Sequence, residues 1–311
     1  MMRISCIMEL FLEVSVILFL FTLFFQDIDF IHINLLEDLG IPHPKYGFVM
    51  DQKIVLADGP KIIVLDKNGG LIGAWNKKGR GPGESNGGLI FPVDGNIWMY
   101  DVLNGRINQY SLGLEFLKTT NLKNVTNYII VYKGVVYWPQ LQDKEIVINS
   151  MDLKLQNKYK PLKINGMINF KDNWYNLKLL DSTTVVCFEV VQKEENYSVH
   201  LVNFENGIVQ LLKIKLKNFG YHSKAREDSF LEASIKGAPL LGNIASQRGT
   251  MYVFTEKILN FKKQKIELSL FKIHRKTGSF IEDLGDKYLL NSGLSEAVLM
   301  LDLDHGLTIQ Y

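Results

Sequence analysis

Cysteine is scarce in this sequence, with two in 311 residues. Cys6 precedes the most apolar stretch of the chain, and Cys187 lies within the apolar run TTVVCFEVV. This usage excludes a disulfide framework. We therefore predict that Cys187 is a small, buried, hydrophobic side chain.

An excess of charge of one sign is also lacking. The chain has 35 basic and 33 acidic residues, a formal net charge of +2, which argues against nucleic acid as a partner. One basic stretch, from Lys257 to Lys276, interleaves its charges with Phe271 and Ile273. We interpret it as the outer face of an edge strand, where lysine discourages aggregation.

The signatures of catalysis and metal binding are missing. None of the six histidines belongs to an H-x-H or H-E-x-x-H motif, and there is no G-x-S-x-G motif. The segment LDLDHG, Leu301 to Gly306, begins like a calcium loop, but the position of its closing glutamate lies beyond Tyr311. We predict a turn there, and no catalytic residue, metal ion or cofactor in the chain.

Helical periodicity is almost absent, and short β-branched and aromatic runs separated by glycine-rich turns take its place. Similar three-strand modules start at Lys53, Gly95, Gly134, Thr183 and Gly249, and a further start lies at His305. Since another run precedes each module, the pattern is four strands per blade. The sequence predicts an all-β fold, a six-bladed β-propeller of residues 27–311, whose strands alternate apolar and polar side chains. We expect Asn218 to Ser246 to be a long loop or a short helix.

The last module is short, because only EAVLML and GLTIQY precede the end of the chain. An alternating segment without a partner, Asp27 to Leu35, lies before the first blade. A two-stranded ribbon alone is marginal in water. We therefore predict that this N-terminal strand closes the last blade and buries Ile28, Phe30 and Ile33.

Residues 1–26 form a hydrophobic leader. Its uncharged run of twelve residues, Val14 to Phe25, is shorter than the roughly 20 needed to span a membrane and suits a signal-peptide core. Arg3 is the only basic residue before it, and no small-x-small cleavage site follows. The leader favours a signal or a membrane anchor over an N-terminal element packed on the domain. It predicts a location in the cell envelope: periplasmic, extracellular or membrane-anchored.

The motif GRGPGE, Gly79 to Glu84, follows the first predicted blade, and VDGNIWMYD opens the next one. This arrangement, between about Lys53 and Tyr110, resembles the Gly-Pro-Gly-Glu motif of bacterial TolB-like and NHL-like six-bladed β-propellers. The resemblance implies the fold and a place in the envelope, and it leaves the function open.

The spacing of Gly79, Gly81 and Gly83 is not that of a phosphate-binding G-x-G-x-x-G loop, and no helix is predicted to follow. We interpret the motif as structural. Its glycines allow positive φ, Pro82 fixes a bend and Glu84 caps amide groups of the loop.

Binding residues are expected on loops at the channel mouth. His222, Arg226 and Asp228 are candidates for lining a pocket, although a solvated loop has the same composition. The sequence favours a non-catalytic binding or scaffolding protein with a protein, small-molecule or glycan partner. One alternative is a hydrolase or lyase with a metal in the central channel, where acids such as Asp51, Asp94 and Asp181 are scattered. Another is a truncated family member without a present function.

Overall fold

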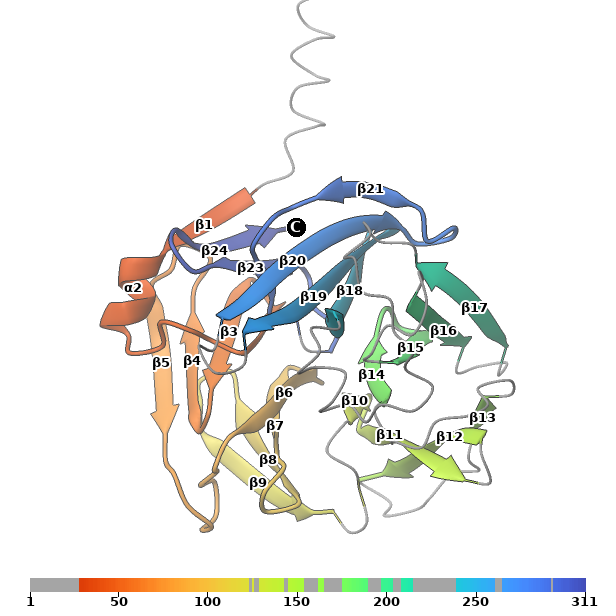
Figure 1. Ribbon diagram of the computed structural model, residues 1–311. Coiled ribbons are helices and arrows are strands. Elements are labelled where there is room, and N and C mark those ends of the chain that lie inside the picture. The colour runs from red at the N-terminus through yellow and green to blue at the C-terminus, as the bar shows by residue number, and fades with distance from the viewer. Residues whose placement is uncertain are drawn as a thin grey trace, which may run out of the picture.

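Six four-stranded antiparallel sheets surround a central axis in the computed structural model (Figure 1). The predicted all-β, six-bladed propeller is therefore confirmed. The structure describes residues 28–122, 125, 129–142, 145–153, 162–164, 175–189, 197–203, 208–214, 239–260, 265–291 and 293–311.

The first three blades follow one another along the chain. Blade 1 contains β2 (Tyr46–Met50), β3 (Lys53–Asp58), β4 (Lys61–Leu65) and β5 (Leu71–Asn76). Blade 2 contains β6 (Gly88–Val93), β7 (Asn96–Asp101), β8 (Arg106–Ser111) and β9 (Phe116–Asn121). Blade 3 contains β10 (Ile130–Tyr132), β11 (Val135–Gln142), β12 (Glu145–Asp152) and β13 (Leu162–Ile164).

The other three blades complete the ring. Blade 4 contains β14 (Tyr175–Leu179), β15 (Thr184–Glu189), β16 (Tyr197–Asn203) and β17 (Val209–Ile214). Blade 5 contains β18 (Pro239–Gln247), β19 (Thr250–Asn260), β20 (Lys265–His274) and β21 (Phe280–Asp283). Blade 6 contains β22 (Tyr288–Leu289), β23 (Val298–Asp302), β24 (Gly306–Gln310) and the N-terminal β1 (Ile28–His32).

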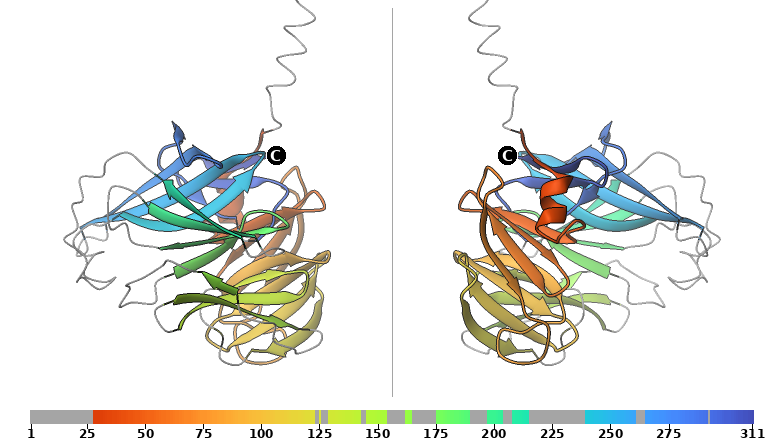
Figure 2. Two further views of the ribbon diagram at one scale, coloured as in Figure 1. Left: turned by 90° about the vertical axis from the view of Figure 1, so that its right-hand side faces the viewer. Right: turned by 90° about the vertical axis from the view of Figure 1, so that its left-hand side faces the viewer.

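The predicted closure by an N-terminal strand is confirmed. β1 pairs antiparallel with β24, so the two ends of the described chain share one sheet. The short helix α2 (Ile33–Asp38) follows β1 on the outside of the ring (Figure 2). The expected burial of Phe30 was wrong, because its side chain is 45% exposed and Ile31 is the buried residue.

Two further sequence predictions were wrong. His305 precedes the third strand of blade 6, not its second, because the pairing of β22 was too short to recognise. Part of Asn218 to Ser246 is a strand, since β18 begins at Pro239. The turn predicted within LDLDHG is present between β23 and β24.

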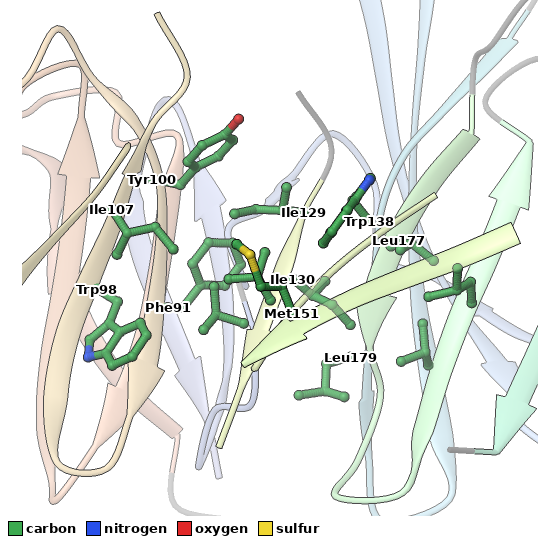
Figure 3. Close-up of a cluster of buried hydrophobic side chains, with 14 of the residues drawn as sticks. Phe91, Trp98, Tyr100, Ile107, Ile129, Ile130, Trp138, Met151, Leu177 and Leu179 are labelled. Carbon is green, nitrogen blue, oxygen red and sulfur yellow. The ribbon is translucent and has the colours of Figure 1, made fainter. Parts of the chain in front are cut away.

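The core lies between the blades rather than within them. Figure 3 shows Phe91 and Trp98 of blade 2 facing Ile130 and Trp138 of blade 3, and Leu179 of blade 4 completes the same cluster. Other clusters join blades 1 and 2, 4 and 5, 5 and 6, and 6 and 1. Apolar contact therefore continues around the whole ring. Cys187 is buried in this core, as predicted.

Burial falls from the middle of each blade towards its rim. In blade 1, four of the six residues of β3 are buried, whereas none of β5 is. The middle strands are covered on both faces by neighbouring blades, so their sequences are continuous apolar runs and not the alternation that we predicted. The interpretation of Phe271 and Ile273 as part of an edge strand was also wrong. Both are buried in β20, and β21 forms the edge.

The predicted leader, residues 1–26, lies outside the described residues. In the part of the chain that the structure describes, none of the helices is long and apolar enough to cross a membrane.

Candidate functional site

A cavity of about 790 Å³ lies on the axis of the ring and takes lining residues from the innermost strands of all six blades. Many of these residues come from the first half of their strand or from the segment just before it, for example Tyr46, Leu89 and Tyr288. The cavity therefore lies towards the end of the channel where the innermost strands begin. Its volume is typical of small-molecule sites.

The cavity wall is predominantly apolar. Residues of this kind come from β6, β10, β18, β19 and β22. They include Leu89, Phe91, Ile130, Leu241, Phe254 and Leu289. A β-bulge in β18 shifts the register between Leu241 and Asn243, so that Gly242 has no residue opposite it in β19. Bulges often redirect side chains beside binding sites.

Lys178 is the most unusual polar residue of this wall. Its neighbours in β14, Leu177 and Leu179, point into the core shared with blade 3 (Figure 3). Because successive side chains of a strand alternate, Lys178 faces the opposite way, towards blade 5. Burial lowers the pKa of its ammonium group from 10.5 to about 8.

A single carboxyl group lines the cavity within the described residues, that of Glu256 on β19. Burial raises the pKa of this side chain. Tyr288 lies nearby, and its pKa is raised first by burial and then by the charge of Glu256. Its ring centroid is 5.4 Å from that of Phe254. Among the described residues, the cavity thus offers two ammonium groups, those of Lys45 and Lys178, and one carboxyl group on a largely apolar surface.

Asn243 also lines the cavity, but its hydrogen bonds hold the ring together. Its amide nitrogen donates to the carbonyl oxygens of Leu289 at 2.7 Å and Asn291 at 3.0 Å, and its oxygen accepts from the Ile244 N–H at 3.0 Å. Blade 5 is thereby joined to blade 6. The side chain of Asn243 has its donors and one acceptor position in use.

The GRGPGE motif lies away from the cavity, against blade 2. Glu84 Oε2 accepts from the Gly81 N–H at 2.7 Å, the kind of contact proposed for it from sequence. Gly83 has φ +72°, and an added Cβ would lie 2.9 Å from the ring of Phe116. Pro82 is exposed, and Gly79 has φ +151°.

Side chains of β8 bind the carbonyl groups of this loop. Arg106 donates to the carbonyl oxygens of Arg80 and Glu84, each at 2.6 Å, and Tyr110 donates to that of Gly83 at 2.7 Å. The Asp101 carboxylate lies 3.6 Å from Arg106 Nε. These carbonyl groups are occupied by the protein itself.

The other candidates from sequence are not gathered at the cavity. Asp51 and Asp94 are exposed in the turns between the first two strands of their blades, at the end of the ring away from the starts of the innermost strands. Asp181 forms an ion pair with Arg275. Within the described residues, no group of three His, Cys, Asp or Glu side chains could hold a metal ion. His222, Arg226 and Asp228 lie outside the described residues.

Sequence reasoning missed Lys178 and Glu256. Lys178 lies between two leucines and Glu256 between Thr255 and Lys257, and charged residues on solvated strand faces have similar neighbours. Only the closed ring reveals which strands are innermost, so the sequence carried no signal for either residue.

No family model matches the chain, and a search of curated proteins found no match. Solved structures share its fold. A member of the DUF4221 family from Bacteroides vulgatus is 12% identical with a TM-score of 0.53, covering 85% of this chain and 91% of that one. A predicted exported protein from Bacteroides fragilis is 12% identical with a TM-score of 0.54, covering 86% and 89%. At such identities the similarity concerns the fold alone, a six-bladed propeller, and the resemblance to TolB-like and NHL-like propellers stays a prediction.

Proposed function

We propose that this protein is a non-catalytic binding propeller that holds a small molecule in its central channel. The observation that carries the proposal is the cavity of about 790 Å³ lined from all six blades. Ligand sites combine an apolar wall with a few polar groups, and this cavity has that composition. A scaffold that closes its ring through an N-terminal strand also keeps such a wall in a fixed shape, which lowers the entropic cost of binding.

We further propose that the protein acts in the cell envelope. The apolar run from Val14 to Phe25 supports this location. One of the structural neighbours, from Bacteroides fragilis, is itself predicted to be exported. Fractionation of the full-length protein tests this part: recovery only from the soluble cytoplasm would contradict it.

The channel site is tested with N-phenylnaphthylamine, an uncharged apolar dye whose fluorescence rises in apolar surroundings. Leu89→Trp adds a large ring at a partly buried position of the cavity wall. Leu117→Trp is the matched control, because Leu117 is 51% exposed on β9 of the same blade. The proposal expects dye binding by the wild type and the control and its loss in Leu89→Trp. Equal binding by both variants would place the dye outside the channel.

The alternative of a metal-dependent hydrolase or lyase lacks a set of ligands among the described residues. Metal analysis of dialysed protein tests it. Retention of one equivalent would favour the alternative over a binding protein.

A further inference from the structure

Lys178 has no charge partner among the residues that the structure describes. In the part of the chain that the structure describes, no hydrogen bond or ion pair of its ammonium group is present, and it forms no ion pair with Glu256 although both line the cavity. Placing a charged group away from water is unfavourable unless an opposite charge compensates it. None of the described residues therefore compensates the cation that Lys178 contributes to the cavity wall.

The other basic groups of the cavity are placed differently. Lys45 is exposed at the rim and lies 3.8 Å from Asp58, and His43 is exposed beside it. Lys178 is only partly accessible and comes from the second-last position of β14, within the strand and not in a segment before it. It faces blade 5, where Leu241 and Gly242 supply apolar surface. An anion that reached Lys178 would bring the rest of its molecule against this wall.

Glu256 limits the charge that such a ligand can carry. One ammonium group balances one negative charge, and a carboxyl group in the same cavity disfavours a second. The lining outside these two groups is mostly apolar and suits a hydrocarbon body.

We propose that Lys178 binds the carboxylate of an apolar monoanion, of the class of medium-chain carboxylic acids, whose hydrocarbon part fills the channel. This inference rests on the proposed function, since it names the ligand class of the same cavity. The ammonium group donates charge-assisted hydrogen bonds to the carboxylate, and Glu256 discriminates against dicarboxylates.

Four probes of equal chain length test the proposal: decanoate, decanol, decylamine and decanedioate. Their affinities are measured by displacement of N-phenylnaphthylamine or by calorimetry. A hydrogen bond to a charged group predicts that decanoate binds at least about tenfold more tightly than decanol. Decylamine and decanedioate are expected to bind more weakly than decanoate.

Lys178→Met replaces the ammonium group by an uncharged chain of similar length. The proposal expects the preference for decanoate over decanol to disappear in this variant, while decanol affinity changes little. Lys118→Met, on the exposed outer strand β9, is the matched control and keeps the preference.

The outcomes separate the two proposals. Equal affinities of wild type for decanoate and decanol, both lost in Leu89→Trp, would overturn the role of Lys178 and leave the channel site standing. A decanoate preference that survives in Lys178→Met would also overturn it. Failure of all four probes to bind would overturn the ligand class, and the dye experiment with Leu89→Trp and Leu117→Trp would still decide whether the channel binds apolar molecules.

Discussion

Replacing Lys178 by methionine should stabilise the protein, because a residue kept for binding is costly to the fold. The pKa of Lys178 falls from 10.5 to about 8 on folding, owing to burial. At about 1.4 kcal/mol for each factor of ten, this corresponds to an upper limit of roughly 3 kcal/mol. The side chain is partly accessible, so solvent screening reduces the figure, and we expect a gain of about 1–3 kcal/mol at pH 7.

The pH dependence identifies the cause of this gain. Below pH 8 the lysine is protonated in both states and the full penalty acts on the folded state. Between pH 8 and 10.5 the unfolded chain holds its proton while the folded protein releases it, so the stability of the wild type rises relative to the variant. The advantage of Lys178→Met should therefore shrink across this window and vanish above it.

Urea unfolding of wild type, Lys178→Met and Lys118→Met at several pH values provides the assay. Because Lys118 is exposed on β9, its variant should stay within about 0.5 kcal/mol of wild type. Two results would refute the reasoning: Lys178→Met is no more stable than wild type at pH 7, or its advantage stays constant up to pH 11. Either result would show that burial of the charged ammonium group does not destabilise the folded protein.

Three further predictions concern the ring. Deletion of residues 1–36 should lower the free energy of unfolding by roughly 3–6 kcal/mol relative to deletion of residues 1–26, because it removes the buried side chains of Ile31 and Leu36. Equal melting temperatures of the two variants would show that β1 does not close blade 6. Arg106→Met should lower the free energy of unfolding by about 3–5 kcal/mol, because it leaves Asp101 buried without its cation. The control Arg80→Met, at an exposed position, should leave the free energy of unfolding almost unchanged. Similar losses in the two variants would refute the role of Arg106. Asn243→Ala should lower stability by about 1–3 kcal/mol by leaving two carbonyl groups at the seam without a donor, and an unchanged unfolding midpoint would contradict that.

The number of blades and the closure could be predicted from sequence because they depend on local signals. Turns such as those at Asp94-Gly95 and Lys133-Gly134 need positive φ, and the structure has it at all four residues. These turns recur in blades 1, 2, 3 and 5, where they precede the second strand, whereas residues 180–183 of blade 4 connect its first two strands without positive φ. Blade 6 was not recognised in this way, because β22 consists of two residues and the three residues after it include no glycine.

The interior of the channel could not be predicted in the same way. Whether Lys178 faces water or a cavity depends on which face of β14 meets blade 5, and that is decided by contacts between residues far apart in sequence. The exposure of Phe30 has the same origin. An alternating strand has two faces, and only its pairing with β24 determines that Ile31 points inward.

The most direct measurement is a crystal structure of the full chain grown with decanoate that carries bromine on its last carbon. Anomalous scattering locates the bromine without reference to any assumed site. We predict a bromine peak inside the ring of innermost strands, with the carboxylate within hydrogen-bonding distance of Lys178 Nζ. A peak only on the outer surface of the ring, or a carboxylate in the channel turned away from Lys178, would contradict the proposed site or its anion-binding residue, respectively.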